Sequence, residues 1–93
     1  MELNEAFGAT LRQARIQRNL TQEDFSLVSS RTNVSLLERG GTIPTLEKLE
    51  ALCTVLDVHP VSLLAACYLR KEGSNDTAAL LRQIDAELQQ LFS

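Results

Sequence analysis

The segment 21–40 (TQEDFSLVSSRTNVSLLERG) constrains the fold most, because two short helix patterns lie in it on either side of a polar turn. In the second pattern, 31–39, Val34, Leu37 and Glu38 follow three- and four-residue steps and share one face of a helix. The residues of the opposite face are Thr32, Ser35, Leu36 and Arg39. The first face can pack on a core, whereas the second remains available to solvent or to a binding partner.

The outer face of the second pattern carries groups suited to reading DNA. It presents hydroxyls, a methyl-rich side chain and a guanidinium on a helix narrow enough to enter the major groove. Ser30 is a typical N-cap residue, so Arg31 would lie at the end of the helix that leads into the groove. The segment therefore predicts a helix-turn-helix motif that binds double-stranded DNA.

The remaining sequence predicts an all-α chain. Its 93 residues suffice for one domain with a modest core, and 44% of them are apolar. Helices are expected over 4–18, 22–28, 31–39, 46–56, 60–69 and 77–92. The segment 70–76 (RKEGSND) has the composition of a linker.

Residues at the expected helix ends support this division. Thr21, Thr45 and His59 each precede a helix pattern and can cap its first turn, and Pro60 suits a first helical position. Asn19 can end the first helix because Asn tolerates the left-handed conformation. The residues predicted to face inward from the first, second and fourth helices are Phe7, Leu11, Ala14, Phe25, Val28, Leu46, Leu49, Leu52, Cys53 and Leu56.

Charge is distributed unevenly along the chain. The net charge is −3, yet residues 8–43 contain five Arg against three acids, while residues 44–93 contain four basic and seven acidic residues. The first half could therefore present a positive face to DNA. The alternative is that these arginines only solvate surface helices.

The residue inventory argues against an enzyme, a cofactor site and a metal site. Cys53 and Cys67 are fourteen residues apart, the only His is His59, and neither a CxxC pair nor a Gly-rich phosphate loop is present. Two buried, reduced cysteines are expected, with a redox-sensing pair as the alternative. The longest apolar run, 63–69, is too short for a membrane span, and no signal-peptide pattern is visible, so a cytoplasmic protein is expected.

The last helix pattern carries an apolar seam. Leu81, Ile84, Leu88 and Leu91 recur at steps of three and four residues, as the a and d positions of a coiled coil do. Such a helix needs a partner surface, and the polar linker before it favours a second copy of the chain. We therefore predict a homodimer, with packing on its own domain as the alternative.

Three motifs in register over residues 5–68 resemble the Cro/repressor-type (xenobiotic-response-element-like) helix-turn-helix family of transcriptional regulators. They are Thr21-Gln22, Glu38-Arg39-Gly40 and Pro44-Thr45-Leu46. The resemblance implies a five-helix repressor-like DNA-binding domain over 1–70, followed by a linker and an amphipathic dimerisation helix over 71–93. It implies a sequence-specific regulator, such as a repressor or autoregulator, and an inverted-repeat operator would match a homodimer.

The resemblance also implies roles for individual residues. The positions matching base readers are Arg31, Thr32 and Leu36, and the expected phosphate contacts are Gln22, Asn33, Ser35 and Arg39. Arg15 and Glu38 match a family salt bridge between the first and third helices. An inward Glu38 needs such a partner because an unpaired buried carboxylate is costly.

The chain departs from the family pattern at two points. The turn Val28-Ser29-Ser30-Arg31 is shorter than usual, so the second helix could end early. Leu36 replaces a base reader that is commonly polar, and it can touch a thymine methyl but cannot donate a hydrogen bond. These departures leave open an alternative function, a helix-turn-helix module that binds a protein partner with little DNA specificity.

Overall fold

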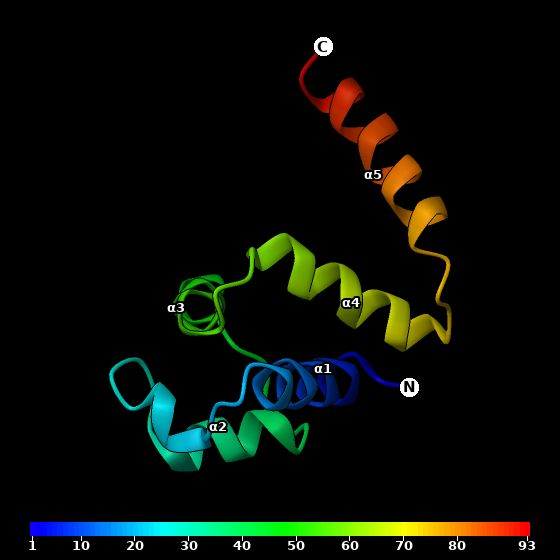
Figure 1. Cartoon of the computed structure of the whole chain (residues 1–93). Coiled ribbons are helices and arrows are strands. Elements are labelled where there is room, and N and C mark those ends of the chain that lie inside the picture. The colour runs from blue at the N-terminus through cyan, green and yellow to red at the C-terminus, as the bar shows by residue number, and fades with distance from the viewer.

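The computed structural model describes all 93 residues and contains only helices, turns and loops. The elements are α1 (Leu3–Gln17), the 3₁₀ helix η1 (Gln22–Phe25), α2 (Arg31–Glu38), α3 (Leu46–Leu56), α4 (Pro60–Glu72) and α5 (Thr77–Leu91). Figure 1 shows α1 between α2 on one side and α4 on the other, with α3 beside the start of α4. The chain is all-α, as the sequence predicts.

A single core holds these helices together. Phe25, Leu11, Leu37 and Leu52 are among its largest fully buried side chains, and they come from four different elements. Burying a side chain of this size contributes about 1.5–3 kcal/mol, so the core is the main source of stability. The other core residues are Phe7, Val34, Leu49, Cys53, Leu56, Leu63 and Cys67.

The helix ends follow the predicted caps. The side chains of Ser30, Thr45 and His59 accept hydrogen bonds from backbone N–H groups in the first turns of α2, α3 and α4. Asn19, just beyond the end of α1, has φ +58°, the left-handed conformation expected for it. These bonds satisfy N–H groups that a helix start leaves without partners.

A glycine lets α1 approach α2 closely. A Cβ atom on Gly8 would lie 2.5 Å from the carbonyl oxygen of Leu37 and 2.6 Å from that of Glu38. No side chain fits this crossing without moving backbone, so Gly8 fixes the distance between α1 and the end of α2.

The second helix is shorter than predicted. η1 is a single 3₁₀ turn that ends at Phe25. The backbone N–H groups of Val28 and Ser29 both donate hydrogen bonds of 2.9 Å to the carbonyl oxygen of Phe25. The chain turns here between Phe25, which is fully buried, and Ser30, which caps α2. The expected helix over 22–28 is therefore wrong in its type and its end, whereas the early end that the short turn left open is the one found.

Two further expectations need correction. Leu46, predicted to face inward, is 79% exposed, because it is the first residue of α3 and no other element covers it.

The second correction concerns the end of α4. This helix continues to Glu72, so residues 70–72 are not part of the linker. Arg70 holds this last turn in place, since its Nε donates to Thr10 Oγ1 of α1 at 3.2 Å. Gly73, with φ +67°, then ends the helix.

The last helix stands apart from the rest of the fold. Figure 1 shows α5 leaving the far end of α4 and pointing away from α1, α2 and α3. None of its residues is buried, and a hollow between α4 and α5 is lined by Leu64, Tyr68, Leu80 and Ile84 among others. Leu81, Leu88 and Leu91 of the predicted seam are 53%, 45% and 76% exposed.

No single helix of the chain is long and apolar enough to cross a membrane. Only α3 and α4 taken together have the required length and apolar composition, and the chain bends by 102° at the break between them.

Candidate nucleic-acid interface

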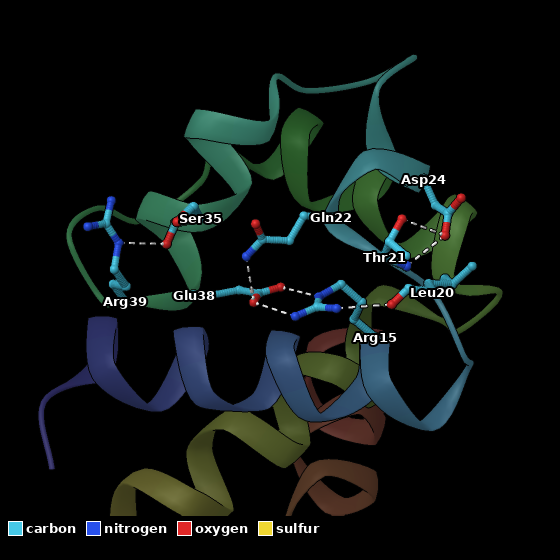
Figure 2. Close-up of polar contacts among 8 residues, drawn as sticks. All are labelled: Arg15, Leu20, Thr21, Gln22, Asp24, Ser35, Glu38 and Arg39. Atoms are coloured by element: carbon cyan, nitrogen blue, oxygen red, sulfur yellow. Dashed lines mark hydrogen bonds and ion pairs between the residues drawn. The ribbon is translucent and has the colours of Figure 1, made fainter.

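The inner face of α2 is fixed by an ion pair with α1. Arg15 Nε lies 2.7 Å from Glu38 Oε2, and Arg15 Nη2 donates to Glu38 Oε1 at 3.0 Å (Figure 2). The side chains are only 13% and 4% exposed. The hydrogen bond to Glu38 raises the pKa of Arg15 above its ordinary value, although burial acts in the opposite direction. The structure thus brings together the two residues that the sequence assigned to a structural pair.

Arg15 and Glu38 also organise the chain at η1. Arg15 Nη1 donates to the carbonyl oxygen of Leu20 at 3.0 Å, and Gln22 Nε2 donates to Glu38 Oε1 at 3.2 Å (Figure 2). Gln22 was assigned to a phosphate contact. Its amide nitrogen carries two hydrogens and Glu38 occupies one of them, so the second is free for another acceptor.

The start of η1 is closed by its own capping residues. The backbone N–H and the hydroxyl of Thr21 donate to Asp24 Oδ2 at 2.6 and 3.1 Å (Figure 2). The side chain of Thr21 in turn accepts from the backbone N–H of Asp24, which completes a capping box. The Asp24 carboxylate therefore has a structural role, which is to stabilise the first turn of η1.

The outer face of α2 borders a shallow hollow lined only by polar residues. These are Gln22, Arg31, Thr32, Ser35 and Arg39, all of which the sequence assigned to DNA contacts. Arg39 Nε donates to the carbonyl oxygen of Ser35 at 3.2 Å, which holds this guanidinium against its own helix (Figure 2). The arrangement offers hydroxyl, amide and guanidinium donors on one open surface, which suits a phosphate-lined groove.

The remaining two residues assigned to DNA contacts lie outside this hollow. Asn33 lies in the first turn of α2 and is half-buried, and its Nδ2 donates to Oγ of Ser29, in the turn before the helix, at 2.7 Å. Leu36 is 38% exposed and lies over Gly41, where an added Cβ would meet Leu36 Cδ1 at 2.3 Å. In this structure Asn33 therefore supports the turn, and Leu36 borders the loop that follows α2.

Two contacts at the interface were missed by the sequence analysis. Lys48 Nζ donates to the carbonyl oxygen of Val28 and so ties α3 to the turn before α2. Arg31 Nη1 lies 3.3 Å from Glu23 Oε1. Neither contact has a local sequence signal, because the partners lie 20 and eight residues apart and belong to different elements.

The two cysteines are buried, unlike the exposed polar residues of this surface. Cys53 and Cys67 are free and buried, and burial raises the pKa of both thiols. Such thiols stay protonated and are poor nucleophiles. No group of three or more His, Cys, Asp or Glu side chains is placed so that it could hold a metal ion.

The fold and the polar face of α2 define a helix-turn-helix DNA-binding domain. A model of the helix-turn-helix family HTH_3, the Cro/repressor type, matches residues 11–63, which is more than half of the chain. The chain belongs to this family, and it is a DNA-binding transcription regulator and not an enzyme.

Solved structures agree with this assignment. The chain is similar to the clp gene regulator ClgR from Corynebacterium glutamicum, with a TM-score of 0.68 and 28% identity over 73% of this chain and 91% of that one. A second structure of ClgR matches with a TM-score of 0.69 and 26% identity over 94% and 88% of the two chains. No curated protein matches the sequence.

Proposed function

We propose that this protein binds an inverted-repeat operator in double-stranded DNA as a homodimer and controls transcription there, as a repressor or autoregulator in the cytoplasm. The observation that carries the proposal is the two-sided character of α2. One face is locked to α1 through Glu38, and the other borders an open hollow lined only by polar side chains.

Within this proposal, α2 is the helix that enters the major groove. Arg31 lies at its N-terminal end with a side chain that is 69% exposed, and it is the best candidate for a bidentate contact to guanine. Thr32 is the second base-reading candidate, and Leu36 would have to swing away from Gly41 to touch a thymine methyl. The proposed phosphate contacts are Gln22, Asn33, Ser35 and Arg39.

The homodimer is supported by the state of α5. A helix with half-exposed Leu81 and Leu88 at coiled-coil spacing leaves apolar surface in water, and a second copy of the chain would cover it. We assign α1 to α4 to DNA binding and α5 to dimerisation. A two-fold dimer would place its recognition helices about 34 Å apart, the distance between successive major grooves on one side of a duplex. The similarity to ClgR, described as a clp gene regulator, supports a role in gene control.

A binding titration on random duplex tests the DNA proposal directly. The purified protein should bind at low salt, and the logarithm of its affinity should fall linearly with the logarithm of salt concentration, because phosphate contacts release counterions. Selection from randomised duplexes should then yield an inverted repeat. Absence of binding at low salt would contradict the proposal.

The competing candidate is a helix-turn-helix module for a protein partner. It is favoured by Leu27, which is 98% exposed in the turn beside α2, and by the partly exposed Leu36. The same titration separates the two candidates. A protein module would show no salt-dependent binding to duplex, whereas a DNA-binding regulator would.

A further inference from the structure

Glu23 is an acidic residue in a surface that is proposed to face DNA. It follows Gln22 in the first turn of η1, and its carboxylate oxygen Oε1 lies 3.3 Å from Nη1 of Arg31. Both side chains are well exposed, 64% for Glu23 and 69% for Arg31. The contact therefore joins an acid to the residue with the strongest case for reading a base.

Structural roles account for little of this carboxylate, although Glu23 is one of two acids in the first turn of η1. An exposed pair of this kind contributes little to stability, because water screens the attraction and two long side chains lose freedom. Capping of η1 is performed by Asp24, which binds both the backbone N–H and the hydroxyl of Thr21. The only hydrogen bond or ion pair formed by the Glu23 carboxylate is the one with Arg31.

We propose that Glu23 is a specificity-determining residue, which holds the guanidinium of Arg31 away from phosphates and releases it only to a base edge that binds it in bidentate fashion. This inference rests on the proposed DNA-binding function. On non-cognate DNA, Arg31 stays with Glu23, and the carboxylate faces phosphates of the same charge. On cognate DNA, the two hydrogen bonds to guanine replace the single contact to Glu23.

The variant Glu23→Gln tests the proposal because it keeps the size of the side chain and removes its charge. Arg31 would then be free to bind a phosphate on any sequence. We expect the affinity for random duplex to rise about threefold to tenfold at 0.1 M salt. One additional phosphate contact by each recognition helix that binds should also steepen the salt dependence on random duplex, by about 0.9 in the log–log slope for each contact. The affinity for the selected operator should rise less, so that the ratio of specific to non-specific affinity falls.

Two controls isolate the effect. Glu50→Gln removes the same charge from an exposed position on α3 outside the polar hollow, and should leave the specificity ratio unchanged. In an Arg31→Ala background, Glu23→Gln should raise the affinities for operator and random duplex by the same factor, because only repulsion is removed. This double-mutant cycle measures the coupling of Glu23 to Arg31.

The outcomes separate this inference from the function on which it rests. If Glu23→Gln raises both affinities equally with Arg31 present, Glu23 is only a repulsive charge and the inference is wrong, while the DNA-binding function stands. If the unmodified protein fails to bind duplex at low salt, the DNA-binding function itself fails and the inference fails with it. A lower ratio together with a steeper slope on random duplex supports both.

Discussion

Arg15 of α1 and Glu38 at the end of α2 form a nearly buried ion pair through two hydrogen bonds of 2.7 and 3.0 Å. Because Glu38 Oε1 also accepts from Gln22, one carboxylate connects α1, η1 and α2. The orientation of the proposed recognition helix therefore depends on this carboxylate in addition to the core residues Val34 and Leu37 of its inner face. This dependence can be measured.

Glu38→Ala should lower the free energy of unfolding by about 3–5 kcal/mol, because the mostly buried Arg15 guanidinium loses its charged partner. Urea denaturation monitored by circular dichroism measures the change. The matched control is Glu23→Ala, which breaks the exposed pair with Arg31 and should cost about 1 kcal/mol or less. Equal effects of the two variants would show that the Arg15–Glu38 pair has no special structural role.

Gly8→Ala should destabilise the protein although alanine is intrinsically better in a helix by about 1 kcal/mol. The added Cβ would press on the backbone carbonyls of Leu37 and Glu38, and overpacking of this kind costs about 1–3 kcal/mol. Thermal unfolding provides the measurement. Gly73→Ala is the control, since no atom lies within 4 Å of its added Cβ and only the left-handed backbone is penalised. An increase in melting temperature for Gly8→Ala would contradict the close crossing of α1 and α2.

Much of the fold could be predicted from sequence because the signals are local. Ser30, Thr45 and His59 cap helices within their own first turns, and the apolar steps in α1 and α2 identify the faces that become buried. One of the failures depended on a contact between distant segments. Residues 70–72 have a linker composition, yet the bond of Arg70 to Thr10, 60 residues away, keeps them helical.

The outline of the candidate interface was predictable because it, too, depends on local spacing within one helix. Three- and four-residue steps place Thr32, Ser35 and Arg39 on one outer face of α2, and the structure finds them around one hollow. Side-chain orientation was not predictable. The attachment of Gln22 to Glu38 and of Arg31 to Glu23 depends on how η1 lies against α2, which the short turn between them determines.

Arg31→Ala should weaken operator binding by about 1–3 kcal/mol for each half-site and relax selectivity at one base pair in each, because a bidentate contact to guanine is lost there. Fluorescence anisotropy on operator duplexes with each base pair substituted in turn gives the measurement. Arg12→Ala removes the same charge from an exposed position on α1 and serves as the control. Equal weakening on all duplexes would instead identify Arg31 as a phosphate contact.

Stability should fall at alkaline pH because of the two buried thiols. Burial raises the pKa of Cys53 and Cys67, and the neighbouring Cys67 raises that of Cys53 further. The folded state therefore keeps these protons at a pH where the unfolded chain, with thiol pKa values of about 8.5, has released them. Below the thiol pKa of the unfolded chain, the buried thiols contribute their full stabilisation. Above it, each thiol lowers the free energy of unfolding by at most about 1.4 kcal/mol per pH unit.

Urea unfolding between pH 8 and pH 10 should show this fall, and the double variant Cys53→Ala/Cys67→Ala should show a shallower one. Identical slopes would mean that the thiols titrate normally in the folded state.

Replacing Ile84 and Leu88 with Glu should convert the protein from a dimer into a monomer, because two carboxylates would have to be buried in an apolar seam. Both residues lie on the α5 face that also carries Leu81 and Leu91, whose side chains are 53% and 76% exposed in the single chain. Light scattering at micromolar concentration measures the oligomeric state. The variant should also lose operator affinity far more than affinity for random duplex, since only the operator requires two recognition helices at a fixed spacing.

The control for this variant places the same charges on the opposite side of α5. Ala86→Glu with Gln89→Glu adds two carboxylates away from the seam, and should leave the dimer and its operator affinity intact. If the unmodified protein is already a monomer at micromolar concentration, the proposed dimer is wrong, and α5 would then cover the hollow beside Leu64 and Tyr68 of its own α4. In that case selection from randomised duplexes should return a single half-site, because no two-fold axis would remain to be copied into the DNA.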